Sequence, residues 1–194
     1  MAIHPSSYTT FRRSLAAVKS AKYHLKRIVQ NARLTYESFY ALLVQIESIL
    51  NSRPLCPLSQ DPYDLQALRP GHFLIGESLT TLPQRNVTEI PTNTLNNFQQ
   101  LQQMCQNFWK KWSSEYLHTV QQRNKWRIDV PEGIRIGDLV LLKEDNTPPL
   151  LWPLGLVTEL HPGNDGAIRV VSVRTNRGEV KRGVKKVCFL PKSE

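Results

Sequence analysis

Closely spaced strand signals between residues 133 and 190 constrain the fold of this chain more than any other feature. Short runs of β-favouring residues alternate with turn residues at 137–138, 162–166 and 176–178. Such spacing is typical of a small closed sheet. We therefore predict an SH3-like β-barrel, with an OB-fold as the alternative. The expected strands are 136–143, 152–161, 167–175, 179–182 and 187–190.

Apolar residues at helical spacing predict three helices before these strands, so the expected fold class is α+β. The first helix is expected over 12–31 and the second from Thr35 to the residue before Pro54. A long third helix is expected over 94–123, and its apolar stripe contains several aromatic residues. Amphipathic helices normally bury such a stripe. The predicted stripe of the third helix is Leu95, Phe98, Leu101, Cys105, Phe108, Trp112, Tyr116 and Val120.

The segment between the second and third helices is rich in proline, which indicates an extended connector. Within it, the apolar run His72–Gly76 is expected to form one short strand or an apolar plug. The predicted organisation has four parts. These parts are 1–53 (the helical remnant), 54–93 (the connector), 94–130 (a spacer helix) and 131–194 (the barrel).

The formal net charge of +9 is distributed unevenly along the chain. Residues 1–34 carry +7, residues 35–132 carry −1 and residues 133–194 carry +3. Charge segregated in this way is typical of proteins that bind polyanions. The alternative is an ordinary solvated basic surface. A further candidate contact is at Lys110 and Lys111, beside Trp109 and Trp112, with the indole rings stacked on the bases of nucleic acid.

The three cysteines are Cys56, Cys105 and Cys188, which are far apart in the sequence and form no C-x-x-C pair. We therefore expect buried, inert thiols and neither a zinc site nor a disulfide framework. No apolar run approaches the roughly 20 residues of a membrane span, and residues 1–14 lack the apolar segment of a secretory signal.

Four sequence motifs indicate a family. They are NSRPLCPLS (51–59), LRPGHFLIGESL (68–79), FWKKWSSEYLHTVQQRNKW (108–126) and the run WPLGLVTELHPGNDGAIRVVSVRTNRGEVKR (152–182). In this order they resemble the C-terminal part of BEL/Pao-type retrotransposon polyproteins. There they lie at the end of the integrase core and in the small domain that follows it. The resemblance covers residues 15–190.

This resemblance implies that the chain lacks catalysis. The integrase core of the family uses two Asp and one Glu to hold two metal ions, which clamp the attacking and leaving oxygens. The strands with both Asp residues would lie before residue 1, and Leu15 occupies the position of the Glu. Leucine cannot ligate a metal. The resemblance therefore implies a non-enzyme with no metal or cofactor.

The resemblance also implies DNA contacts on two basic surfaces. In integrases, lysines one and two turns after the catalytic Glu approach the DNA end, and Lys19 and Lys22 hold those positions. The barrel of the family binds the DNA backbone. From the family pattern we would expect a basic residue at Leu156 and Pro at Gly183. The predicted nucleic-acid-binding residues are Lys19, Lys22, Lys26, Arg27, Arg174, Arg177, Lys181, Arg182, Lys185 and Lys186.

The expected function is sequence-independent nucleic-acid binding, with DNA favoured over RNA and no membrane partner. Alternatives are a fragment of an active integrase, a protein-interaction module with Trp126 and Trp152 lining a groove, and a decayed product without selected function. The apolar faces of the first two helices would normally pack on an absent core sheet. They are therefore expected to pair with each other, with the third helix or with a second copy of the chain. An integrase relative would act in the nucleus.

Overall fold

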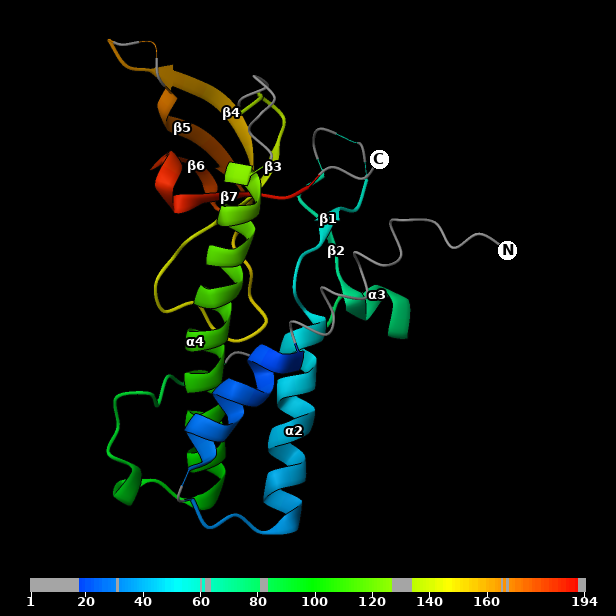
Figure 1. Ribbon diagram of the computed structural model, residues 1–194, viewed down its shortest axis with the longest axis vertical. Helices are drawn as coiled ribbons and strands as arrows, with labels where there is room; N and C mark the ends of the chain where they lie inside the picture. The colour runs from blue at the N-terminus through cyan, green and yellow to red at the C-terminus, as the bar shows by residue number, and fades with distance from the viewer. Residues whose placement is uncertain are drawn as a thin grey trace.

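The computed structural model describes residues 18–30, 32–59, 61, 64–80, 84–126, 134–164, 166 and 168–191, except the side chains of 122–126. Within this part, helices are followed by a five-stranded antiparallel sheet. The long helix α4 (Asn97–Trp126) runs along the molecule, and the sheet lies by its C-terminal end (Figure 1). Helix α2 (Tyr36–Asn51) and the helix at 18–29 lie along the remaining length of α4. The expected α+β class is confirmed.

Helix α2 begins and ends where its capping residues predict. Thr35 is the N-cap, and its hydroxyl oxygen accepts a hydrogen bond from the backbone N–H of Ser38 at 3.2 Å. Glu37 lies in the first turn, where a negative charge suits the helix dipole. Ser52 caps the C-terminal end, two residues before Pro54. The predicted helix from Thr35 to Pro54 is therefore confirmed.

Helix α4 follows a 3₁₀ turn, η1 (Thr92–Thr94). Its start is capped reciprocally, because Asn96 accepts from the backbone N–H of Gln99 at 2.9 Å while the Gln99 side chain accepts from the Asn96 N–H at 3.1 Å. Most of the predicted apolar stripe is buried. Phe98 is the exception, since it is 68% exposed in the first turn.

The connector contains more regular structure than its proline content predicts. Strands β1 (Cys56–Pro57) and β2 (Ala67–Leu68) pair antiparallel. The strand expected at His72–Gly76 is wrong, because these residues belong to helix α3 (Pro70–Ile75) and its C-cap. Proline at the first helical position leaves no backbone N–H unsatisfied, and Gly76 adopts φ 79°, where glycine carries no steric penalty.

Glutamine side chains of α4 hold the second half of the connector. Gln103 donates to the carbonyl oxygens of Val87 at 2.8 Å and Ile90 at 2.6 Å. The side-chain oxygen of Gln106 accepts from the Val87 N–H at 2.9 Å. Both glutamines and Val87 are buried, so these bonds supply the partners that a buried backbone needs. Residues 85–90 are therefore part of the packed fold.

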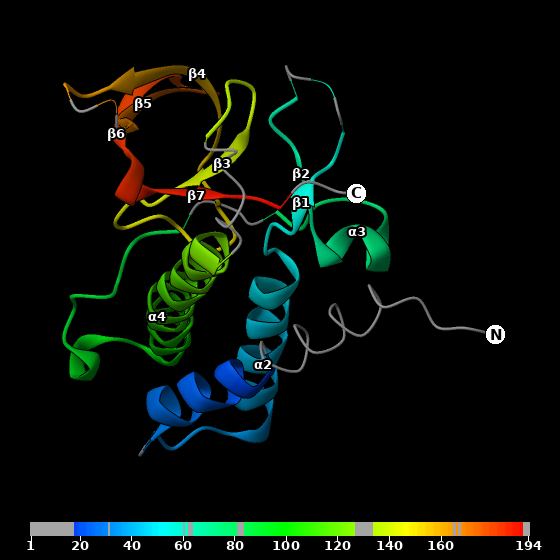
Figure 2. The same ribbon diagram turned by 45° about the horizontal axis from the view of Figure 1, so that its top comes forward.

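The sheet contains every strand that the sequence predicts, with bounds that differ by a few residues. Its order is β6-β5-β4-β3-β7, and all neighbouring strands are antiparallel. Among the described residues, β6 and β7 do not pair, so the sheet is curled but open (Figure 2), and a closed barrel is not confirmed. The elements are β3 (Leu139–Leu142), β4 (Leu154–Pro162), β5 (Ile168–Thr175), β6 (Gly178–Gly183), the 3₁₀ turn η2 (Val184–Lys186) and β7 (Val187–Phe189).

Two hydrophobic cores use the two faces of this sheet. We name the first the shared core, because α2, α4 and one sheet face contribute to it. It includes Leu42, Ile46, Ile49, Cys105, Phe108, Trp109, Trp112, Leu139, Leu141, Trp152, Leu156 and Cys188. We name the second the sheet core, because every fully buried member comes from the sheet. It consists of Val140, Leu142, Val157, Val171, Val173 and Val187.

Trp152 joins the helices to the sheet. It precedes β4 and is only 5% exposed. Its ring packs edge-on against Trp109 at 4.8 Å and Tyr116 at 5.4 Å between ring centroids. Its indole N–H donates to the hydroxyl of Ser52, at the end of α2, at 3.1 Å. One buried side chain therefore contacts α2, α4 and the sheet, as aromatic residues with a polar handle do in cores.

The apolar faces of the first two helices pack mainly on α4. Leu42, Ile46 and Ile49 of α2 are buried against it. The pairing with the third helix is one of the three arrangements that the sequence predicts. An apolar groove of about 530 Å³ remains between the 18–29 helix, α2 and α3, and Phe73 beside it is exposed. Self-association through these faces stays a prediction. Among the described helices, none is both long and apolar enough to cross a membrane.

Candidate nucleic-acid interface

Three lysines form one exposed basic face on the 18–29 helix. Lys19, Lys22 and Lys26 are separated by three and four residues, which places them on one side of the helix. All three are exposed, and residues 18–29 contain no Asp or Glu. We name these three residues the helix lysines. Arg27, also predicted as a contact, lies over the ring of Tyr23 at 5.0 Å and is hydrogen-bonded to its hydroxyl.

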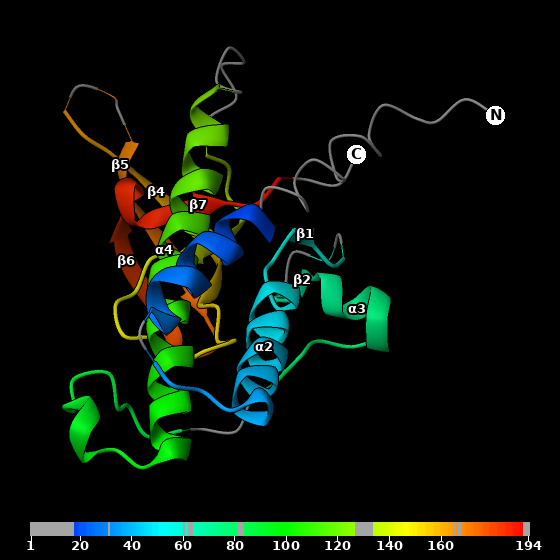
Figure 3. The ribbon, with the colours of Figure 1, turned by 60° about the horizontal axis from the view of Figure 1, so that its bottom comes forward.

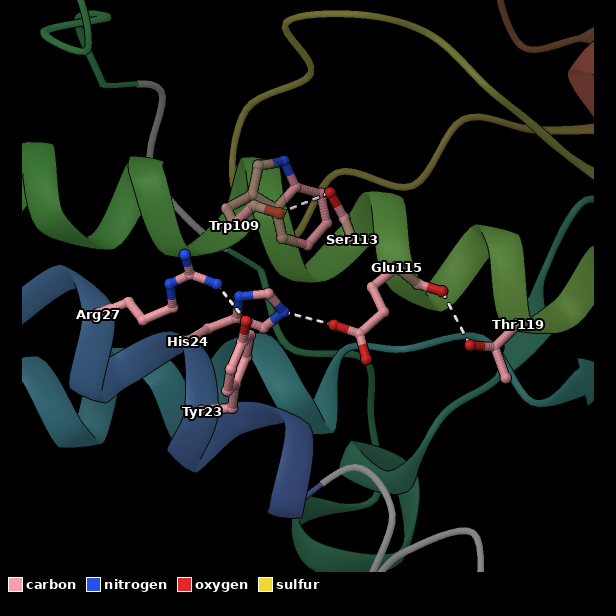
Figure 4. Close-up of polar contacts among 7 residues, drawn as sticks. All are labelled: Tyr23, His24, Arg27, Trp109, Ser113, Glu115 and Thr119. Carbon is pink, nitrogen blue, oxygen red and sulfur yellow. Dashed lines mark hydrogen bonds and ion pairs between the residues drawn. The ribbon is translucent and has the colours of Figure 1, made fainter.

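A buried histidine fixes the orientation of this helix. His24 lies on the side facing α4 and is hydrogen-bonded through Nε2 to the carboxylate of Glu115 (Figure 4). Its ring also packs edge-on against Phe108, with centroids 6.3 Å apart. These contacts turn the opposite, lysine-bearing side towards solvent. No local pattern predicts this pairing, because His24 and Glu115 are 91 residues apart.

The hairpin of β5 and β6 carries the second basic set. Lys181 pairs across the hairpin with Ser172, and Arg174 pairs with Glu179. Residues that pair directly share a sheet face, and alternate residues return to it. These four side chains therefore share the face opposite to Val173 and the sheet core. Lys181 is exposed there, whereas Arg174 is half-buried beside a carboxylate-bearing neighbour.

Arg182 belongs to the other face of β6 and is already paired. Its register partner on β5 is Val171, a member of the sheet core. The guanidinium reaches Glu144 after β3, with 3.4 Å between Nη2 and Oε1. This ion pair neutralises Arg182 locally. The sequence-based prediction grouped it with Lys181, but the alternation of a strand sends adjacent side chains to opposite faces.

Lys185 and Lys186 project from η2, next to the C-terminal part of α4. The side-chain amide of Gln121 donates to the Lys185 carbonyl at 2.9 Å, which fixes the turn on α4. Both lysine side chains are exposed. Together with Lys181 we name them the sheet lysines. Arg177 is exposed in the β5–β6 turn, where its backbone N–H donates to Thr175 at 3.2 Å.

The two lysine sets lie on different sides of α4. The 18–29 helix contacts α4 at Phe108 and Glu115, whereas β7 and η2 contact it at Leu117 and Gln121. At about 100° per residue, Leu117 is about 180° around the helix from Phe108. Figure 3 shows α4 passing between its neighbours, with the 18–29 helix crossing its middle. The structure therefore keeps the helix lysines and the sheet lysines on two separate surfaces.

The two departures from the family pattern have different structural settings. Leu156 is 3% exposed and belongs to the shared core, so this position offers no surface for a basic side chain. Gly183 has φ −67° and ψ 141°, a conformation that any residue adopts. Proline fixes φ near −65°, so the backbone φ at Gly183 suits the proline expected there.

The prediction that the tryptophans of α4 stack on nucleic-acid bases is wrong. Trp109 and Trp112 are buried in the shared core, and the Trp109 N–H donates to the carbonyl of Thr147 at 2.8 Å. Only Lys110 and Lys111, between the two rings, are exposed. Helical periodicity already favoured a core position for these rings. Leu15 and the side chain of Trp126 lie outside the described part of the chain.

Cys105 and Cys188 are buried as predicted, and burial raises the pKa of both thiols to about 11. Both are therefore protonated and unreactive near neutral pH. Cys56 is half-buried, and burial also raises the pKa of its thiol. Within the described residues, no group of His, Cys, Asp and Glu side chains is placed to hold a metal ion.

A second cavity, of about 360 Å³, lies where the connector meets the sheet. It is lined by Leu65 and Arg69 before α3, by the loop between β3 and β4, and by the β5–β6 turn with Arg177. The Nε of Arg69 is buried and has no hydrogen-bond partner among the described residues. Sequence reasoning missed Arg69, because nothing in its local pattern distinguishes it from other connector residues.

Comparison with known families gives a match to the second half of the chain. Residues 96–190 match a family of unknown function, DUF5641. The matched region contains α4, the whole sheet and the sheet lysines, but not the 18–29 helix. No curated protein and no solved structure matches the chain. The family match supports treating α4 and the sheet as one recurring unit.

Proposed function

We propose that this chain binds the backbone of nucleic acid, with DNA favoured over RNA, without sequence preference and without catalysis. The observation that carries the proposal is a set of six exposed lysines on two surfaces. The ion pairs that the structure gives within the described residues involve none of these lysines. Unneutralised lysines of this kind contact phosphates, which position a protein but carry no base information.

The shape of the sheet supports the same proposal. Strands β6 and β7 are the two edges, and only the short turn η2 separates them in the chain. Such a sheet needs only further curling to close into an SH3-like barrel, the fold of the integrase C-terminal domain that the sequence resembles. On this proposal η2, with Lys185 and Lys186, lies on the outside of the barrel near Lys181.

The absence of catalysis is proposed from the sequence resemblance, in which Leu15 takes the place of the metal-binding Glu. Leucine has no oxygen ligand for Mg²⁺. Incubation of the chain with Mg²⁺ or Mn²⁺ and retroelement-end duplexes is therefore expected to give no cleavage and no strand transfer. Activity that a chelator abolishes would instead identify the chain as part of a working integrase.

The interaction-module alternative is less well supported. It places Trp152 in a groove open to a protein partner, but this ring is almost fully buried and its N–H is bonded to Ser52. Salt dependence also separates the two functions, because binding through phosphates releases counterions and weakens steeply with salt.

The decisive experiment measures binding to a duplex of scrambled sequence at a series of salt concentrations, with fluorescence anisotropy as the readout. Six to eight phosphate contacts predict a slope of log affinity against log salt of about −5 to −7. Replacing Lys181, Lys185 and Lys186 with glutamine removes three contacts, so the slope should become shallower by about 2–3 units. The same change at Lys19, Lys22 and Lys26 should have a similar effect.

Arg182→Gln is the matched control within the hairpin. Because Glu144 already neutralises this guanidinium, its loss should leave the slope nearly unchanged, well below the roughly 0.9 unit of one phosphate contact. A sheet-lysine triple variant that binds scrambled DNA as tightly as the parent, at both low and moderate salt, would show that the hairpin is not the nucleic-acid surface. In that case the proposed function fails for the sheet.

A further inference from the structure

One nitrogen of a half-buried arginine at the cavity between the connector and the sheet is buried and lacks a hydrogen-bond partner in the described part of the chain. Arg69 lines this cavity, and its Nε has no hydrogen-bond partner among the described residues. A buried guanidinium N–H that lacks an acceptor is unfavourable, because it has lost its hydration without replacing it. The pKa of Arg69 is lowered by this burial. An oxygen-rich anion in the cavity would supply the missing hydrogen-bond acceptor.

The carboxylates around the cavity do not supply this anion. Glu144 and Asp145 both line it. Glu144 is engaged by Arg182 at 3.4 Å, and Asp145 is exposed to solvent. No ion pair of Arg69 with either is found in the described part of the chain. The guanidinium therefore remains available to a ligand.

A second arginine lines the same cavity from the sheet. Arg177 lines it from the β5–β6 turn and is exposed. Its side chain makes no hydrogen bond or ion pair within the described residues, since the one bond at this position comes from the backbone N–H. Two arginines that approach one cavity from different elements suit a tetrahedral oxyanion, because guanidinium groups bind phosphate oxygens in pairs.

The loop that forms the remaining wall contains two unusual backbone conformations. Asn146 has φ 58° and Leu150 has φ 67°, although neither is glycine. Asparagine tolerates this region, but a leucine there is uncommon and unfavourable. Strained residues of this kind cluster at ligand-binding sites, where the surrounding fold maintains them. The hydrogen bond from the Trp109 indole N–H to the Thr147 carbonyl oxygen attaches this loop to α4.

We propose that this cavity is a phosphate-binding subsite in which Arg69 and Arg177 together hold one phosphate group. The subsite rests in part on the proposed function, because Arg177 belongs to the same hairpin as Lys181. A nucleic-acid strand that follows the hairpin would present one backbone phosphate to the cavity. The subsite thus extends the proposed surface from exposed lysines to a recessed, partly desolvated contact.

Thermal unfolding of the full chain in inorganic phosphate tests the subsite without DNA. Ionic strength is kept constant with sodium chloride. At phosphate tenfold above its dissociation constant, the parent should melt roughly 3–6 °C higher than in chloride alone. Arg69→Met should lose this rise. Arg177→Gln, at an exposed turn where folding is not at risk, should lose at least half of it.

Arg85→Gln is the matched control, because it removes an exposed arginine charge from the 84–90 segment, and the hydrogen bonds at Arg85 use only its carbonyl. It should keep the full rise. No rise in the parent, or a full rise in Arg177→Gln, would overturn the subsite even if the chain binds DNA.

Binding to scrambled duplex distinguishes the source of the phosphate. A salt slope shallower by about 0.9 unit in Arg177→Gln would place a nucleic-acid phosphate in the subsite. A phosphate-dependent rise that both variants lose, without any DNA binding, would support the subsite with a free phosphate as its ligand, while the proposed function fails.

Discussion

The shared core and the sheet core occupy opposite faces of one sheet, but they are built from different residues. The sheet core is aliphatic, and its fully buried members all lie between residues 140 and 187. The shared core is rich in aromatic rings, and it joins segments as distant as Ser52 and Trp152, 100 residues apart. One core therefore closes a local unit, whereas the other attaches that unit to the helices.

This difference matters for the proposed interface. The sheet lysines are positioned by the hairpin and by the bond from Gln121 to the turn η2. The helix lysines are positioned through His24 and the shared core. A fixed spacing between the two surfaces therefore depends on the shared core, while the sheet core alone can maintain only one of them.

Removing the Trp152 ring from the shared core should have the largest effect on the free energy of unfolding. Trp152→Ala should lower the free energy of unfolding by about 3–5 kcal/mol, because it leaves a cavity among Trp109, Trp112 and Tyr116. Chemical denaturation followed by tryptophan fluorescence and by circular dichroism measures this loss. If the shared core couples the two halves, both signals should shift together.

Trp152→Phe is the control for this prediction. It keeps most of the buried ring but loses the hydrogen bond to Ser52, which is worth about 0.5–1.5 kcal/mol. Its loss of stability should be clearly smaller than that of Trp152→Ala. An alanine variant that unfolds the helices early and leaves the sheet transition unchanged would show that the cores are independent.

Alkaline pH should weaken the shared core specifically. Cys105 and Cys188 belong to it, and burial raises the pKa of both thiols to about 11, from an ordinary value of 9.0. The unfolded chain then loses these protons at lower pH than the folded chain. The stability from each thiol is thus complete below pH 9 and decreases as the pH rises towards 11, by about 2 kcal/mol each.

Comparison with alanine variants isolates this effect from lysine and tyrosine titration. Cys105→Ala and Cys188→Ala should each lose less stability than the parent between pH 8 and pH 10.5 in urea unfolding. The sheet core contains no titratable side chain, so it makes no contribution of this kind to the pH dependence of stability. Parallel pH profiles for parent and variants would contradict the assignment of the alkaline loss to these thiols.

Local patterns predicted the sheet core better than the shared core. Val171 and Val173 alternate with the polar residues Ser172 and Arg174, and the turns between strands contain glycine, so each strand could be located from its own sequence. The same reasoning located α2 by its cap Thr35 and α4 by its apolar stripe. These features depend on neighbours in the chain, which a sequence displays directly.

The features that the sequence did not predict depend on contacts between distant segments. The pairing of Arg182 with Glu144, the cavity at Arg69 and the bond from His24 to Glu115 each join different elements. Helix α3 is a different case, because Pro70 and Gly76 are local helix signals. The apolar run between them suggests a strand, but proline at the first position and glycine after the last favour a helix.

The smallest expected effect concerns the sheet alone, at the turn before β7. A Cβ added at Gly183 would meet only the Arg169 carbonyl oxygen, at 3.8 Å, and φ there is −67°. Gly183→Ala should therefore raise the free energy of unfolding by about 0.4–1 kcal/mol, because alanine restricts the unfolded chain. Thermal unfolding measures this gain. Gly155→Ala is the opposite control, since its Cβ would lie 2.4 Å from Val173 Cγ1 and 2.9 Å from the Arg174 carbonyl oxygen. It should destabilise the sheet, and a destabilised Gly183→Ala would show that the turn needs the freedom of glycine.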